Sequence, residues 1–292
     1  MATLTAVRRG LNSRTGLRRL NPHGAGFWTY AALIAVLLGS LFPIYWSLAV
    51  ASHDNDAIAS IPPVLTPGGH LFENIARVFD TTAFGQAMFN SFLVSGSVTI
   101  SVVLFSTLAG FAFAKLRFRG RNILLVMAIA TTTVPQQLGI IPLYILMAEL
   151  GWTGKLEAVI VPGLVTAFGV FLMTQYLSSA IPDELLEAGR IDGCTTLRLF
   201  WHVVLPAARP AAAVLGLFTF MQAWNDFFWP LVVLTPENPT VQVALSSLAS
   251  GYTTDYALVL TGTVLAIVPI VAVFAALGRQ IIGGIMSGAI KG

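Results

Sequence analysis

Residues 185–206 form a charged segment within a very apolar sequence, and they include side chains that could make specific contacts. The segment reads LLEAGRIDGCTTLRLFWHVVLP. Its Glu187 carboxylate could accept charge-assisted hydrogen bonds from a basic group on another chain. Gly193 would permit a sharp turn and a close backbone approach, because glycine has no Cβ atom. The segment therefore has the chemistry of a recognition surface.

Cysteine and histidine, the usual metal ligands and nucleophiles, are not grouped in this sequence. The single cysteine is Cys194, and the four histidines are His23, His53, His70 and His202. Their positions show no paired ligand spacing, so we predict no metal site and no cysteine nucleophile. The GxxxxGK[ST] phosphate-binding pattern is absent as well. Any work driven by ATP must therefore draw on another chain.

The elements that hold this segment must be helices that cross a membrane. Of the 292 residues, 56% are hydrophobic and 10% are charged, and the mean hydropathy is +0.80. Soluble domains have about 25% charged residues. Five stretches carry no charge and a sixth is interrupted only by Asp226. Each stretch is long enough for the roughly 20 apolar residues that cross a bilayer.

The predicted fold class is therefore an all-α integral membrane protein with six spanning helices. They are placed near residues 27–50, 87–113, 122–147, 156–177, 211–234 and 256–278. Together they define a membrane domain at 27–278, which follows a segment at 1–26 and precedes a tail at 279–292. The longest loop on the inner side is expected at 179–210.

The basic residues predict the orientation of the chain. With the N-terminus inside, all but two of the 16 lysines and arginines fall in cytoplasmic segments, and the two outside are Arg77 and Lys155. Cationic side chains resist translocation, so we expect a multi-pass protein of the cell (inner or plasma) membrane with both termini cytoplasmic. The formal charge of +3 follows from this bias toward an anionic leaflet and implies no nucleic-acid partner.

The first span has an alternative interpretation as a secretory signal peptide. Basic residues precede it, and Ala49-Val50-Ala51 resembles a cleavage site. Its apolar run extends from Phe27 to Ala51, however, and is far longer than the about 7 to 15 residues of a signal peptide. We therefore favour a retained span.

The local sequence of the charged segment predicts two short helices. Pro182, Asp183 and Glu184 suit a first turn, and Asp192-Gly193 suits a helix end. Thr195 or Thr196 could cap the second helix, and Pro206 would close it. The second helix has an extensive apolar surface, so the pair should dock on another surface.

The spacing of this segment resembles that of the membrane subunits of binding-protein-dependent ABC importers. Their cytoplasmic loop has the pattern EAA, three residues, G, nine residues, I, one residue, LP. The matching residues here are Glu187-Ala188-Gly189, Gly193, Val203 and Leu205-Pro206. Two positions depart from the pattern, with Gly189 in place of alanine and Val203 in place of isoleucine.

Further stretches look like the carbohydrate-uptake branch of this family, particularly the second permease of maltose-type transporters. They lie at 89–100, 109–121, 222–232 and 283–292, so the resemblance covers essentially residues 25–292. It implies a type I importer permease fold that forms half of a pathway for a sugar or oligosaccharide. The implied partners are a second permease, two ATPase subunits and an extracytoplasmic binding protein. ATP and Mg would be bound by the ATPases, with no cofactor in this chain.

The resemblance also implies a coupling role for the charged segment, which would seat in a cleft of an ATPase subunit. The implied contact residues are Glu187, Ala188, Gly189, Asp192, Gly193, Leu205 and Pro206. The alternative is that this pair of helices packs under its own bundle. In maltose-type relatives the loop after the fifth span, here about 235–255, reaches into the binding protein, and the tail reaches the ATPases. An ordinary connection and a disordered end are the alternatives for these two segments.

Polar residues within the predicted spans are candidates for the substrate pathway. They are Asn90, Gln136, Gln137, Trp224, Asn225 and Asp226. Hydrogen bonds between helices would use the same side chains equally well. Asp226 lies among aromatic residues near the outer interface, and we favour an interfacial anchor there over a ring platform for sugar.

The cargo has alternatives as well, since glycerol-phosphate and polyol importers share this architecture. A stand-alone secondary transporter would predict internal repeats and an ion-coupling residue. The sequence shows no obvious repeat, and Asp226 is the one candidate coupler. A membrane receptor or scaffold would not need the spaced pattern of Glu187, Gly193 and Pro206. The importer permease is therefore the function that we expect.

Overall fold

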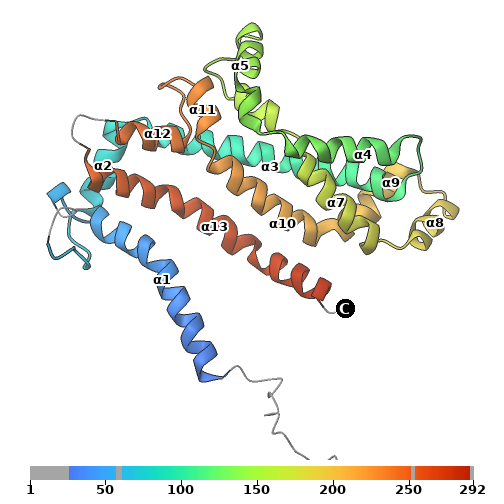
Figure 1. Cartoon of the computed structure of the whole chain (residues 1–292), viewed down its shortest axis with the longest axis horizontal. Coiled ribbons are helices and arrows are strands. Elements are labelled where there is room, and N and C mark those ends of the chain that lie inside the picture. The colour runs from blue at the N-terminus through green and yellow to red at the C-terminus, as the bar shows by residue number, and fades with distance from the viewer. Residues whose placement is uncertain (1–25, 57–60, 251–253, 290–292) are drawn as a thin grey trace, which may run out of the picture. The chain divides into compact units, whose positions relative to one another are not determined.

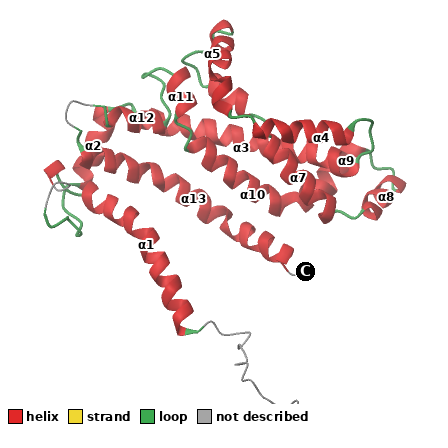
Figure 2. Ribbon diagram, viewed as in Figure 1, coloured by secondary structure: helices red, strands yellow, loops and turns green. Residues whose placement is uncertain are grey.

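A computed structural model of the chain describes residues 26–56, 61–250 and 254–289, with side chains described up to Gly278 in the last helix. Within these residues the fold consists of helices and loops, as Figure 2 shows. The expected all-α class is confirmed. The predicted segment at 1–26 lies almost wholly outside the described residues, and the last three residues of the tail lie outside them too.

Five helical segments among the described residues are long and apolar enough to cross a membrane. They are α1 (Phe27–Ala51), α3 (Phe84–Lys115), α6 (Glu157–Ile160) continuing into α7 (Ala167–Ala180), α9 (Thr196–Leu199) continuing into α10 (Leu205–Trp224), and the first part of α13 (Tyr256–Ala289). The predicted spans at 27–50, 87–113, 156–177 and 256–278 correspond closely to four of them. The backbone of α13 continues as a helix into the predicted tail.

The predicted span at 122–147 is bent rather than straight. It consists of α4 (Arg121–Ala130) and α5 (Ile140–Glu149), joined by short 3-10 turns, and the two halves differ in direction by 91°. Val134 at the break has φ −82° and ψ 121°, because the ring of Pro135 disfavours helical angles for the residue before it. The described chain thus has five spanning helices, or six if the bent pair is one broken span.

The predicted span at 211–234 is shifted toward the N-terminus. The helix runs from Thr196 to Trp224, breaks, and resumes as the short α11 (Phe228–Val233). We expected Pro206 to close a separate helix, and this prediction is wrong. Pro206 lies in the first turn of α10, where a missing N–H is tolerated. A wider π turn, Phe200–Val204, precedes it and joins α9 to α10.

Helix α3 lies at the centre of the compact unit formed by residues 46–292, and α7 and α10 pack along it (Figure 1). Gly110 allows α3 and α7 to approach closely, since a Cβ atom there would lie 2.7 Å from Met173 Cβ. Buried side chains of Val102 and Phe111 join the same core as Leu177 and Leu215. This packing fixes the direction in which α3 ends at Lys115.

The region predicted as a loop at 235–255 contains a packed helix, α12 (Val241–Leu248). Val241, Ala244 and Leu248 recur at helical spacing and are buried in a core shared with α3 and α13. The connection after the predicted fifth span is therefore partly helical, because the apolar face of these residues requires cover. Helix α2 (Leu71–Thr81) completes this end of the unit, with Arg77 paired to Asp255 at the start of α13.

Candidate functional site

Helix α8 (Asp183–Ile191) carries the first half of the charged segment, and its beginning is fastened to the end of α3. Asp183 and Glu184 occupy its first turn, where the helix dipole favours acidic side chains. Lys115 Nζ donates hydrogen bonds to Asp183 Oδ1 at 2.8 Å and to the Ser178 carbonyl oxygen at 3.2 Å. The hydrogen bond from Lys115, followed by its charge, holds the pKa of Asp183 below its ordinary value.

The end of α8 is a Schellman motif built on Gly193. This residue has φ +79°, in the left-handed region that favours glycine. The Gly193 N–H donates to the Arg190 carbonyl at 3.0 Å, and the Cys194 N–H donates to the Gly189 carbonyl at 2.9 Å. The predicted helix end at Asp192-Gly193 is confirmed. The motif reverses the chain within a few residues and delivers it to α9.

Helix α9 begins at Thr195, whose side chain accepts a hydrogen bond from the Arg198 N–H at 3.3 Å, so one of the two predicted caps is confirmed. Leu199 is buried and packs directly on α8. A Cβ atom on Gly189 would lie 2.5 Å from Leu199 Cδ2. The glycine that departs from the family pattern is therefore at the contact between the two helices.

The remaining side chains of this segment form an exposed surface, which we call the α8–α9 surface. Its exposed charged members include Glu184, Glu187, Arg190, Asp192 and Arg198, and its exposed apolar members are Leu185, Ala188, Ile191, Leu197 and Trp201. Ile191 is 87% exposed and Leu197 is 63% exposed. Apolar side chains of this size beside carboxylates are suited to a groove that has basic groups at its edge. Leu205 and Pro206 stand apart from this surface, at the start of α10.

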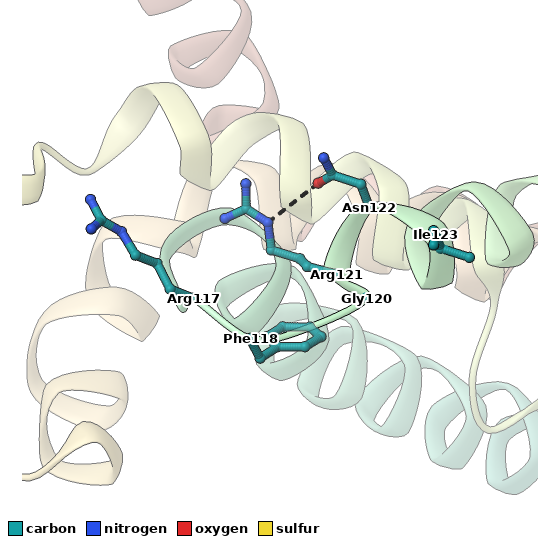
Figure 3. A pocket seen from close by; sticks show the side chains of 6 residues that line it. All are labelled: Arg117, Phe118, Gly120, Arg121, Asn122 and Ile123. Atoms are coloured by element: carbon teal, nitrogen blue, oxygen red, sulfur yellow. Dashed lines mark hydrogen bonds between the residues drawn. The ribbon is translucent and has the colours of Figure 1, made fainter.

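A basic turn connects α3 to α4 near the beginning of α8. It lines a shallow hollow of about 530 Å³ together with the first residues of α4, and its lining residues are Arg117, Phe118, Gly120, Arg121, Asn122 and Ile123. Figure 3 shows the side chains of Arg117 and Arg121 extending away from the ring of Phe118. Arg117 adds a weaker charge contribution to the lowered pKa of Asp183. The turn thus places the positive charge of Arg117 close enough to affect Asp183 at the start of α8.

Two of the candidate pathway residues make structural contacts. Asn90 is buried and its Nδ2 donates to Asn238 Oδ1 at 2.8 Å and to the Pro239 carbonyl at 2.9 Å. Trp224 is 1% exposed, and its Nε1 donates to the Ala266 carbonyl at 3.2 Å. Its ring also stacks on Phe220. The hydrogen bond of Trp224 joins α10 to α13, which is the alternative use foreseen for such residues, and the bonds of Asn90 join α3 to the connection before α12.

The other four candidates lie at helix breaks. Gln136 and Gln137 follow the bend at Pro135 and are exposed. Asn225 ends α10 by donating to the Met221 carbonyl at 2.8 Å, and its Oδ1 accepts from Gln242 at 3.3 Å. Asp226 is half-buried and lies two residues after the end of α10. The six candidates therefore do not share one network of contacts in this structure.

Two residues with clear structural roles were missed by sequence reasoning. Lys115 joins α3 to α8, and Asn238 joins three segments, since its Nδ2 also donates to the Gly154 carbonyl at 3.0 Å. The signal for Lys115 was its place as the first charge after a long apolar run. Among the described residues, no three His, Cys, Asp or Glu side chains gather in a way that could hold a metal ion.

The family described as binding-protein-dependent transport system inner membrane component matches residues 103–282. An sn-glycerol-3-phosphate transport system permease protein of Yersinia enterocolitica is 30% identical over 91% of this chain and 98% of its own. An arabinooligosaccharides transport system permease protein of Halalkalibacterium halodurans is 33% identical over 78% of this chain and 82% of its own.

A solved structure has the same fold. It is a crystal structure of a bacterial ABC transporter involved in the import of the acidic polysaccharide alginate. One of its chains is 24% identical to this one with a TM-score of 0.76, and the match covers 86% of this chain and 95% of that chain.

Proposed function

Since the chain belongs to the family of binding-protein-dependent transport system inner membrane components, we propose that it forms half of the translocation pathway for a sugar or oligosaccharide. It is a permease subunit of an ABC importer in the inner membrane and is not itself catalytic. Such a transporter implies a partner permease, ATPase subunits and a binding protein. ATP and Mg are assigned to the ATPases.

Two kinds of cargo are supported by named relatives. One relative is named for arabinooligosaccharides and others for sn-glycerol-3-phosphate. From Phe84 to Ala114, from Pro210 to Trp224 and from Tyr256 to Gly278 this chain has no lysine or arginine. A phosphate group that leaves water needs charge-assisted hydrogen bonds. The uncharged carbohydrate is therefore our first candidate, and glycerol-phosphate is the second because of the relatives with that name.

The α8–α9 surface is proposed as the contact with an ATPase subunit. The observation that carries this proposal is the pairing of exposed apolar side chains with Glu187 and Asp192 on two short helices whose geometry is fixed by Gly189 and Gly193. Solvated surfaces seldom expose side chains such as Ile191 and Leu197 together. The remaining residues of the proposed contact, Leu205 and Pro206, would act by joining this surface to α10.

Both termini are proposed to be cytoplasmic. The contact between Lys115 and Asp183 supports this, because it requires the basic turn at 116–120 and the charged segment to lie on one side of the membrane. On the opposite side, the exposed tip at 235–237 is proposed to face the binding protein. The helical backbone of α13 as far as Ala289 supports an ordered tail that reaches the ATPases.

Purification from native membranes tests this function. The tagged chain would be extracted in mild detergent, and the proteins that remain bound would be identified by mass spectrometry. We expect an ATPase, a second permease and a binding protein, and we expect the purified binding protein to bind a member of a sugar panel. Binding of sn-glycerol-3-phosphate alone would contradict the carbohydrate assignment. Recovery of this chain alone, active in ion-driven transport, would contradict the proposed assembly.

A further inference from the structure

We propose that Lys115 is the positioning residue of α8, so that the end of α3 sets where the α8–α9 surface stands. This inference rests on the proposed coupling function of that surface. It assigns to Lys115 a role outside the charged segment itself, on a helix that spans the membrane.

Lys115 joins three helix ends at one point. It is the last residue of α3, and its Nζ reaches the carbonyl of Ser178 near the end of α7 and the carboxylate of Asp183 at the start of α8. Its side chain is 7% exposed, whereas that of Asp183 is 72% exposed. The ammonium group is thus enclosed, and the carboxylate reaches it from the solvent side.

The difference in exposure between Lys115 and Asp183 determines the role of their ion pair. An exposed ion pair contributes little to stability, but an enclosed ammonium group without partners is strongly disfavoured. Lys115 therefore holds its two oxygen partners near one point. Only Ile181 and Pro182 separate α7 from α8, so fixing Asp183 beside Ser178 also restricts the angle between the two helices.

Helix α3, which carries Lys115, is held firmly by its neighbours. Helix α3 packs along α7 and α10, and the contact at Gly110 leaves no room for a side chain. A shift of α3 relative to α7 would therefore move Lys115 and its partner Asp183. The far end of α8 is held differently, by apolar packing of Leu199 against Gly189. Lys115 is thus the polar contact through which the spanning bundle orients the surface.

Distance measurements in the assembled transporter test the positioning role directly. Spin labels would be placed at the exposed positions 122 on α4 and 184 on α8, in a background where Cys194 is replaced by serine. Lys115→Gln should broaden the distribution of distances between the labels. Lys115→Arg keeps the charge and the donors and should preserve the distribution. The matched control is Arg119→Gln, which removes an exposed charge from the same turn.

Transport measured with the same variants separates this inference from the proposed function. We expect Lys115→Gln to lower the solute moved per ATP hydrolysed on the order of tenfold, as for the loss of a hydrogen bond to a charged group, while Arg119→Gln does not. An unchanged distance distribution in Lys115→Gln, or an equal effect of Arg119→Gln, would overturn the positioning role. A broadened distribution with unchanged solute per ATP would instead overturn the coupling role of the α8–α9 surface.

A second variant covers the case in which Lys115→Gln does not accumulate in the membrane. Asp183→Asn leaves the enclosed lysine and its bond to Ser178 in place but removes the charge that ties α8 to it. It should broaden the same distances. Full transport per ATP together with unbroadened distances in Asp183→Asn would overturn the inference.

Discussion

Gly189 on α8 lies so close to Leu199 on α9 that a Cβ atom on residue 189 would be 2.5 Å from Leu199 Cδ2. The importer pattern has alanine at this position, and the sequence alone suggests that glycine is a conservative departure. In the structure, the absence of a side chain at Gly189 leaves the space that the Leu199 Cδ2 methyl group occupies. The packing of Leu199 on α8 therefore depends on glycine at position 189.

Restoring alanine at this position should destabilise the chain. Gly189→Ala gains up to about 1 kcal/mol of helix propensity, but overpacking a buried leucine costs about 1–3 kcal/mol. We expect a net decrease in the free energy of unfolding, larger for Gly189→Val, and a lower thermal midpoint of the purified transporter. In a double-mutant cycle with Leu199→Ala, the two changes should be less harmful together than their sum. Strict additivity of the two changes in the free energy of unfolding would show that residues 189 and 199 do not interact.

At Gly193 the backbone conformation, and not the surrounding space, requires glycine. No atom lies within 4 Å of the position that its Cβ would occupy, so the constraint is its φ of +79°. Gly193→Val should cost roughly 1–2 kcal/mol or more of backbone strain and should abolish uptake while membrane insertion is retained. Gly193→Asn is the matched variant, because asparagine tolerates left-handed angles. Uptake and membrane content would be measured for both.

The comparison of these variants separates strain from contact. If Gly193→Asn keeps uptake, the fold of the turn is what matters. If both variants lose uptake with intact insertion, the absent side chain is needed for close approach of a partner. Normal uptake by Gly193→Val would contradict the coupling role.

The parts of the site that sequence could predict are those set by local interactions. Asp192-Gly193 and Thr195 act on backbone groups within a few residues, and both were identified from residue type. Lys115 was missed because its partners, Ser178 and Asp183, are more than sixty positions away and meet it only through the packing of α3 on α7.

The limits of the spanning helices show the same division. Hydropathy located the spans because burial in lipid acts on every residue of a segment. It did not show the bend at Pro135, although proline is a visible signal, because an apolar run has the same composition whether it is straight or bent. The continuation of α9 through Pro206 depends on a π turn that residue types do not specify.

Asn90 should behave as a structural residue rather than as a substrate ligand. Asn90→Ala removes two hydrogen bonds that fasten the segment before α12 to α3 and leaves Asn238 Oδ1 with the longer hydrogen bond from Gln86 Nε2 at 3.3 Å. We expect a loss of about 1–3 kcal/mol in the free energy of unfolding, with an unchanged KM of uptake in the fraction that remains folded. Gln222→Ala, at an exposed position on α10, is the control for stability. If Asn90→Ala raised the KM of uptake and left stability normal, Asn90 would be a substrate-contacting residue after all.

The proposed orientation predicts which of two exposed basic positions can be reached from outside the cell. Lys155 lies in the connection before α6, Arg119 lies in the turn after α3, and both are exposed. Single cysteines at these positions, in a Cys194→Ser background, would be treated with a membrane-impermeant thiol reagent on intact cells. Position 155 should be labelled, and position 119 should be labelled only after the cells are opened.

Because both side chains are exposed, a difference in labelling reports the side of the membrane and not burial. Lys115 ties the turn at 116–120 to Asp183, so the result for position 119 applies to the α8–α9 surface as well. Labelling of position 119 on intact cells would place that surface outside, where ATP-driven subunits do not act. The proposed orientation, the contact with the ATPase and the role of Lys115 in coupling would then all be wrong. The hydrogen bond between Lys115 and Asp183 would then serve some purpose other than coupling.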